Sequence, residues 1–277
     1  MRFPTINITA GATAFFAIHA LAVAAFFYKP SLPMLGACLG LFLIRKFGIT
    51  GGYHRYFSHR SFKTSRWFQF VLAFLGGMSA QKGALWWAAH HRHHHQHSDQ
   101  PEDLHSVKQQ GFYWAHVGWI LAEDYQEFDR NRIKDFMKFP ELVWLDKWHF
   151  VPPVTLGVLC FVLGGWAGFL WSFCVSTVIL YHTTFAINSF CHLLGKRRYE
   201  TGESSKNSLL LAILTLGEGW HNNHHYYPHC ARQGFFWWEF DPTYYVLKAL
   251  KMVGIVHEIK EPPQRVLDGT EATAALG

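Results

Sequence analysis

The stretch that decides the fold runs from Val151 to Leu194 and reads VPPVTLGVLCFVLGGWAGFLWSFCVSTVILYHTTFAINSFCHLL. It contains no Asp, Glu, Lys or Arg, and a transmembrane helix needs about 20 mostly apolar residues. The stretch is therefore long enough to cross a membrane twice. Because the run Gly164-Gly165-Trp166-Ala167-Gly168 favours a turn near its middle, we predict a hairpin of two helices, residues 151–168 and 169–191.

Two more apolar stretches precede this hairpin. Residues 11–28 predict a first span and residues 31–48 a second. The second ends with Arg45 and Lys46, and we expect both side chains to snorkel towards the headgroups. The first stretch has features of a secretory signal, but a second span follows directly, which favours an uncleaved helix. A shorter apolar run, residues 67–78, predicts a helix lying in the headgroup region.

The positions of Lys and Arg orient the four spans. Twelve lie between the second and third spans and nine follow the fourth, whereas only Lys29 lies in a loop on the other side. Since basic residues accumulate on the cytoplasmic side, we predict an all-α integral membrane protein with both termini cytoplasmic. It is a single domain in which two transmembrane hairpins carry a helical cytoplasmic cap, residues 49–150 and 192–277. The membrane is a bacterial inner membrane or the endoplasmic reticulum.

The composition agrees with a bilayer protein that carries a polar cap. Of the 277 residues, 16% are charged, against roughly a quarter in soluble domains. The mean hydropathy of +0.02 is too low for a chain that lies wholly within a bilayer. The net charge of +6 faces anionic headgroups and needs no nucleic acid to explain it. Five cysteines without a C-x-x-C motif predict buried thiols rather than a disulfide framework.

Histidine is as common as Asp and Glu together, at 19 residues each. Most histidines fall in three groups within the predicted cap. Imidazole suits Fe, Zn, Cu and Ni alike, and the clustered histidines exceed the needs of one ion, so we infer a centre with two metal ions. The groups are His54 with His59, the run from His90 to His97, and His221 with His224 and His225, while His192 lies near the end of the fourth span.

Spacing within the groups supports shared ligation. His91 and His95 are four residues apart, as are His221 and His225, so each pair can close on one ion from one helical face. The middle histidine of each H-x-x-H-H motif, His94 or His224, is offset by one residue from the pair that closes on the first ion. Its side chain therefore points in another direction, toward a second ion. The five-residue interval from His54 to His59 does not fit one face of an α-helix, so we expect the chain to leave the helix between them.

Other interpretations compete with a metal centre. A purification tag or a metal-storage tract is an alternative for the run His90 to His97 taken alone. A metal transporter is another, but it needs ionisable ligands near the middle of the bilayer, whereas these histidines lie at or beyond the cytoplasmic ends of the spans. For five further histidines we expect only hydrogen-bonding roles: His19, His149, His182, His229 and His257.

The order H-x(4)-H, H-x-x-H-H and H-x-x-H-H, with membrane hairpins between the motifs, resembles the membrane fatty-acyl desaturases, most closely the acyl-CoA Δ9 (stearoyl-CoA-type) subgroup. Gly217-Glu218-Gly219 and Asn188-Ser189-Phe190-Cys191-His192 match as well. The resemblance implies two iron ions. One is held by His54, His59, His91, His95 and His224, and the other by His94, His192, His221 and His225, with Asn188 bound through a water.

The resemblance also implies the reaction, in which two electrons and O₂ remove two neighbouring hydrogens from an acyl chain and leave a cis double bond. Gln81, Trp87 and Thr184 would line the bend of the substrate tunnel. The alternative for Trp87 is a residue of the interfacial aromatic belt. Because the chain has no C-x-x-C-H haem motif and no G-x-G-x-x-G fingerprint, electrons come from an external cytochrome, ferredoxin or similar donor.

The sequence departs from animal members of the family where they grip coenzyme A. Ala89 and the acidic pair Glu123-Asp124 stand in place of basic residues. We therefore rank the acyl carriers as acyl-CoA first, then acyl-lipid, then a carrier-protein thioester. A related di-iron lipid hydroxylase remains an alternative enzyme. Five other cations are candidates to bind the phosphates of coenzyme A: Lys63, Arg66, Lys82, Arg197 and Arg198.

Overall fold

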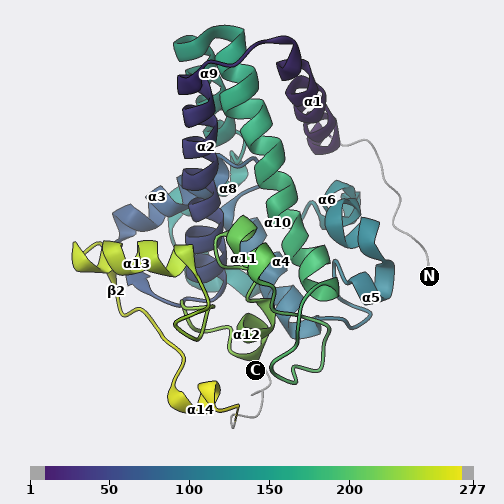
Figure 1. The fold of residues 1–277 in the computed structure, drawn as a ribbon, viewed down its shortest axis with the longest axis vertical. Helices are drawn as coiled ribbons and strands as arrows, with labels where there is room; N and C mark the ends of the chain where they lie inside the picture. The colour runs from purple at the N-terminus through teal and green to yellow at the C-terminus, as the bar shows by residue number, and fades with distance from the viewer. Residues whose placement is uncertain (1–9, 270–277) are drawn as a thin grey trace.

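Four long helical rods stand side by side above a cap of shorter helices (Figure 1). The computed structural model describes residues 10–269. Each rod corresponds to one predicted span, and each hairpin turns at the end far from the cap. The rods are α1 (Ala10–Ala24) with the 3-10 turn η1 (Ala25–Phe27), α2 (Leu32–Phe47), α9 (Val151–Gly168), and η6 (Phe169–Val175) continued by α10 (Ser176–Leu193).

The second hairpin turns inside the glycine-rich run, as predicted. Gly165 has φ 59° and ψ −155°, a left-handed conformation that breaks the helix there. At Gly168 a side chain would lie 2.8 Å from the Cys160 carbonyl oxygen, so the two arms can cross closely only with glycine at that position. Residues 32–58 and 151–193 are apolar and long enough to cross a membrane, and α1 is shorter. The crossing of the membrane by all four rods stays a prediction.

The second rod corrects the expectation of snorkelling. Arg45 and Lys46 are both 0% exposed. Arg45 donates hydrogen bonds to Thr177 Oγ1 at 2.7 Å and to the Leu41 carbonyl at 3.1 Å. Lys46 Nζ donates to Thr184 Oγ1 at 3.1 Å. Because polar hydroxyls on α10 face this end of α2, the two cations lie between rods rather than in the headgroups.

The cap is built from short helices around the lower end of the second rod. The N-terminal part contributes α3 (Arg66–Gly77), α4 (Ala84–His97) and α8 (Pro140–Lys147), which pack with the lower end of the second rod around Ile49, Phe57, Leu72 and Leu85. β1 (Lys63–Thr64) and β2 (Val256–His257) pair antiparallel and link the two parts of the cap. The C-terminal part contributes α11 (Leu209–Thr215), α12 (His221–Tyr226), α13 (Pro242–Met252) and α14 (Gln264–Leu267).

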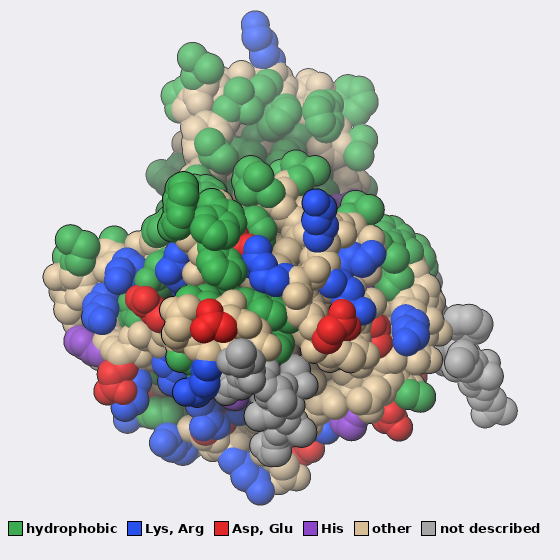
Figure 2. Space-filling model, turned by 60° about the horizontal axis from the view of Figure 1, so that its bottom comes forward, with side chains coloured by type: hydrophobic (Ala, Val, Ile, Leu, Met, Phe, Trp, Pro, Cys, Tyr) green, Lys and Arg blue, Asp and Glu red, His purple; other side chains and the backbone are tan. Residues whose placement is uncertain are grey.

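The remaining cap segments are short and follow α4. They are α5 (Val107–Gln110), η3 (Trp114–Gly118), α6 (Trp119–Leu121), η4 (Glu123–Tyr125), η5 (Arg130–Ile133) and α7 (Lys134–Met137). Figure 2 shows hydrophobic side chains over the rods, and Lys, Arg, Asp and Glu gathered over the cap. All five cysteines are buried and free, as predicted.

Candidate metal centre

The predicted histidines meet beneath the rods, where four elements converge. The segment that continues the second rod carries His54 and His59, and α4 carries the second motif. His192 lies near the end of α10, and α12 carries the third motif. These histidines form two groups, and within each group one ring nitrogen from every histidine lies within 4.8 Å of those of the others. One group holds His54, His59, His91, His95 and His224, and the other holds His94, His192, His221 and His225.

The chain does not leave the helix between His54 and His59, and this part of the sequence prediction is wrong. Instead α2 continues directly into η2 (Gly48–Ser58), a π-helix. The backbone N–H of His59 donates to the carbonyl of His54 at 3.2 Å, which is the i→i+5 bond of that helix. The wider turn brings residues five apart onto one face, so the two imidazole centroids are 4.9 Å apart.

The start of α4 is fixed by a side chain from another helix. Asp146 of α8 accepts hydrogen bonds from the backbone N–H groups of Leu85 and Trp86, each at 3.0 Å. These are donors that a helix N-terminus leaves without intrahelical partners. At Gly83 a Cβ would lie 2.0 Å from Asp146 Oδ1, so the approach requires glycine. This contact sets the position of the histidines that follow on α4.

The first group of imidazoles converges through the Nε2 atoms. His59 and His91 Nε2 are 2.8 Å apart, and His224 Nε2 lies 3.0 Å from Nε2 of both His54 and His95. A single proton on His224 Nε2 cannot form hydrogen bonds to His54 and His95 at once. One metal cation can accept the Nε2 lone pairs of all these imidazoles. In the second group, Nε2 of His192 and His221 are 3.1 Å apart. The buried Nε2 of His225 has no hydrogen-bond partner. This donor set fits two metal ions.

Burial keeps most of these imidazoles neutral, as ligation requires. It lowers the pKa of His59, His91 and His95 well below the ordinary value of 6.5. The same holds for His221 and His224, and the pKa of His225 falls to about 3. Neutral imidazoles present lone pairs to a metal at physiological pH.

Buried carboxylates contact the Nδ1 atoms that face away from the clusters. Glu218 Oε2 contacts His54 Nδ1, and Asp103 Oδ1 lies 2.8 Å from His94 Nδ1. Glu203 lies 3.7 Å from His192 Nδ1 and 3.8 Å from His225 Nδ1. Carboxylates in direct contact, as Glu218 and Asp103 are, fix the tautomer and orientation of metal-binding histidines, whereas Glu203 acts on His192 and His225 through its charge.

Sequence reasoning missed the roles of these three acids. Glu218 was visible only as the centre of the Gly217-Glu218-Gly219 motif, and Asp103 and Glu203 gave no signal. Burial raises the pKa of Glu218, but His54 and Arg55 more than offset it and hold that pKa at about 2. Arg55 is itself buried and bonds Glu218 and Asp241. The carboxylate is therefore ionised beside the imidazole that it orients.

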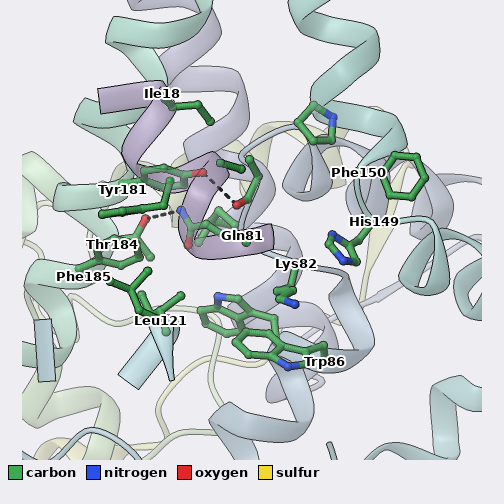
Figure 3. A pocket seen from close by; sticks show the side chains of 18 of the residues that line it. Ile18, Gln81, Lys82, Trp86, Leu121, His149, Phe150, Tyr181, Thr184 and Phe185 are labelled. Carbon is green, nitrogen blue, oxygen red and sulfur yellow. Dashed lines mark hydrogen bonds between the residues drawn. The ribbon is translucent and has the colours of Figure 1, made fainter. Parts of the chain in front are cut away.

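A cavity of about 860 Å³ leads to the histidines (Figure 3). Gln81, Trp87 and Thr184 all line it, as does Asn188 one turn before His192. Gln81 Nε2 donates to Thr184 Oγ1 at 3.3 Å, and the Trp87 ring stacks on His91 with centroids 5.0 Å apart. Trp87 thus lies in the cavity wall rather than in an outer aromatic belt.

Histidines outside the two groups hydrogen-bond, as expected for some of them. His19 Nε2 lies 3.1 Å from His182 Nε2, and His182 Nδ1 lies 3.0 Å from His116 Nε2. In the run on α4, His93 bonds the Glu102 carbonyl and His90 the Trp86 carbonyl, so neither joins a cluster. The neighbouring His105 is buried against His94 and also lines the cavity.

The candidate cations for coenzyme A all have partners within the chain. Lys63 pairs with Glu258 at 2.7 Å, and Arg66 pairs with Glu141 at 2.6 Å. Lys82 Nζ donates to Gln126 Oε1 at 2.6 Å. Arg197 pairs with Glu200 and Arg198 with Glu239. Lys82 alone of these five lines the cavity.

Comparison with known proteins adds a family match and several relatives. The sequence matches the fatty acid desaturase family over residues 29–255. It is 36% identical to the sn-2 palmitoyl-lipid 9-desaturase of Nostoc sp. (strain 36), with 91% of this chain and 90% of that protein covered. It is 36% identical to the sn-1 stearoyl-lipid 9-desaturase of Synechocystis sp., covering 91% and 80%. It is 34% identical to the icosanoyl-CoA 5-desaturase of Limnanthes douglasii, covering 93% and 74%.

Proposed function

Because the chain belongs to the membrane fatty-acyl desaturase family, we propose that it uses O₂ to place a cis double bond in a saturated acyl chain at a di-iron site. The observation that carries this proposal is the junction of one apolar cavity with the buried five-histidine cluster, whose His54 and His91 line the cavity, beside a second buried cluster of four histidines. Apolar walls suit a hydrocarbon chain, and buried neutral imidazoles suit a metal that must act away from bulk water.

The two clusters define the proposed ligands. One iron would bind the cluster of five histidines and the other the cluster of four, with Asn188 bound to the second through a water. When bound, the iron ions supply the O₂ chemistry that removes the two hydrogens. The reaction balances when one acyl CH₂–CH₂ unit, O₂, two electrons and two protons give CH=CH and two water molecules. The electrons come from an external cytochrome, ferredoxin or similar donor.

The chain's own residues position the acyl segment. Trp87 stacks on His91 and so presents a flat apolar wall next to a proposed ligand. Thr184, also in the cavity wall, is held by Gln81 and Lys46, which makes its side chain a fixed feature of the cavity. We propose that these walls bend the chain and select one C–C bond. Relatives named 9-desaturases support position 9, and relatives named 5-desaturases make position 5 the other candidate.

The acyl carrier has two candidates. Acyl-CoA is the carrier ranked first from the sequence, and the name of the Limnanthes relative supports it. A membrane glycerolipid is supported by the names of both cyanobacterial relatives and by the intramolecular pairing of all five candidate cations. Carrier-protein thioesters have no comparable support.

Expression in a host that cannot make unsaturated fatty acids tests the reaction class. Gas chromatography of the host lipids should reveal a new monounsaturated acid, and its mass fragments give the double-bond position. A hydroxylated acid in its place would identify the related hydroxylase. Iron analysis of the purified protein should give about two ions per chain. Far fewer, with no O₂-dependent product, would remove the enzymatic interpretation.

A further inference from the structure

The cavity extends between the first and third rods. Where the cavity passes between these rods, its wall consists of one short face of α1 and one of α9, and both faces are wholly apolar. Val154 and Val158 are each 56% exposed although both line the cavity. Exposed lining residues mark a place where the cavity reaches the molecular surface. The wall includes Ala14, Phe15 and Ile18 of α1, and Pro153, Val154 and Val158 of α9.

The opening lies at membrane depth and on the cap side of the rods. These residues occupy the first turns of α9 and the part of α1 nearest the cap, because both helices run away from the cap (Figure 1). In Figure 3, Ile18 lies on one side of the cavity and Phe150, which directly precedes α9, on the other. Trp86 and Lys82 lie at the inner end.

Contacts of α1 hold it on the side away from α9. Its Phe15 stacks on Tyr181 of α10 with ring centroids 5.5 Å apart. On the same helix, His19 reaches His182 of α10 at 3.1 Å. Because α1 packs in this way on η6 and α10, the space between α1 and α9 is not closed by tight packing of the two helices.

From this opening the cavity continues without interruption to the histidines. The wall of the same cavity also includes Phe173, Tyr181, Gln81, Trp87 and His91. An acyl chain that enters between α1 and α9 therefore passes along apolar walls and meets the five-histidine cluster at His54 and His91 without crossing water. Passage through water would expose each methylene and is unfavourable.

The charges around the cavity do not suit a carrier with several phosphates. Among residues 10–269, Lys82 is the one Lys or Arg in the cavity wall, and its Nζ already bonds Gln126. Recognition of phosphate normally uses Arg or Lys in direct contact. Glu123 and Asp124 lie close to Gln126 in the chain and add negative charge there.

We propose that the gap between α1 and α9 is a lateral portal, through which the acyl chain of a membrane glycerolipid enters while its headgroup stays at the interface. This inference rests on the proposed desaturase function and names its substrate class and route. It also assigns Val154 and Val158 as portal residues.

Photolabelling in nanodiscs tests the portal without requiring turnover. The full-length protein is placed in phosphatidylcholine nanodiscs that contain a phosphatidylcholine with a mid-chain diazirine in a saturated acyl chain. After irradiation, mass spectrometry maps the adducts. We expect adducts at Ile18, Val154 and Val158, and deeper ones near Thr184. Val154→Trp should remove the deep adducts, because the larger ring fills the opening.

Val162→Trp is the matched control. Val162 lies on the same helix and is 71% exposed, and it is not part of the cavity wall. Deep adducts should persist in this variant. Surface adducts alone in the native protein, or deep adducts undiminished by Val154→Trp, would overturn the portal. So would deep labelling by a diazirine acyl-CoA that also persists in Val154→Trp.

Desaturation measured in the same nanodiscs, with iron-loaded protein, O₂ and an added electron-donor system, separates the two proposals. If the native protein shows deep labelling that Val154→Trp abolishes, but forms no double bond, the portal is supported and the desaturase function is rejected. Double bonds formed at the native rate by Val154→Trp support the desaturase and remove the portal.

Discussion

Asp103 Oδ1 lies 2.8 Å from Nδ1 of His94, and both side chains are almost completely buried. Burial lowers the pKa of His94, but the Asp103 carboxylate more than offsets this effect, so the pKa ends above 6.5. The same contact lowers the pKa of Asp103, which therefore stays ionised. The carboxylate holds the proton of His94 on Nδ1 and leaves Nε2 as the atom that can bind a metal.

Asp103→Asn should weaken iron binding in the four-histidine cluster. The amide keeps the shape of the side chain but removes the charge that fixes the tautomer of His94. Loss of such a partner typically costs about 10- to 100-fold in metal affinity or activity. Competition with a chromophoric chelator measures the affinity. Glu200→Gln is the control, since the Glu200 side chain is 91% exposed and pairs only with Arg197 on the surface. Equal affinities in both variants would contradict the role of Asp103.

His221→Ala should reduce the iron content from about two ions per chain to about one, because a cluster of four imidazoles becomes one of three. His97→Ala should leave the content unchanged. His97 belongs to the histidine-rich run on α4 but lies outside both clusters and packs against His93. Elemental analysis gives the iron content of both variants. An equal fall of the iron content in both would favour a metal-storage tract over a centre with defined ligands. His94→Ala with full activity would also refute the ligand assignment.

Glu218 should make stability depend on pH in acid. Its folded-state pKa of about 2 lies below the ordinary 4.5. A lowered carboxyl pKa stabilises the fold above pH 4.5, and this contribution is lost as the pH falls through 2. The full effect is about 3 kcal/mol. The stability of the metal-free native protein should therefore approach that of Glu218→Gln between pH 4.5 and pH 2 in thermal unfolding. A constant difference between the two proteins would refute the assignment.

Much of the fold follows from local features of the sequence. The apolar stretches and the glycine-rich run predicted the four rods and the turn at Gly165. The four-residue spacings placed His91 with His95 in one cluster and His221 with His225 in the other. These inferences succeed because helical periodicity and glycine conformation are set within a few residues.

The errors concern features that depend on distant partners. The π-helix through His54 was not predicted, because an α-helix was the only helical geometry considered for that interval. Arg45 and Lys46 were expected in the headgroups, since their hydroxyl partners lie more than a hundred residues away on α10. The carboxylates at Asp103 and Glu203 were missed because both lie in loops after the helices that carry His94 and His192, and local sequence does not show how these loops fold back. Tertiary contacts, rather than local pattern, decide such positions.

The burial of Lys46 gives the last prediction. Thr184 Oγ1 accepts hydrogen bonds from Lys46 Nζ at 3.1 Å and from Gln81 Nε2 at 3.3 Å, and Thr184 is 5% exposed. Thr184→Val keeps the shape but leaves a buried ammonium without this acceptor, which should cost about 2–3 kcal/mol of unfolding free energy. Thr183→Val is the matched control. The Thr183 hydroxyl bonds only the Leu180 carbonyl of its own helix, so its loss should change stability by less than about 0.5 kcal/mol.

A second substitution distinguishes the loss of this partner from a general disturbance of α10. Lys46→Met removes the charge that Thr184→Val leaves without its acceptor. Replacing both members of a buried polar pair by apolar groups of similar shape is often nearly neutral. The double variant should therefore be more stable than Thr184→Val alone in thermal unfolding in mild detergent. If the two changes simply add, Lys46 is not coupled to Thr184, and the contact does not fix this wall of the cavity.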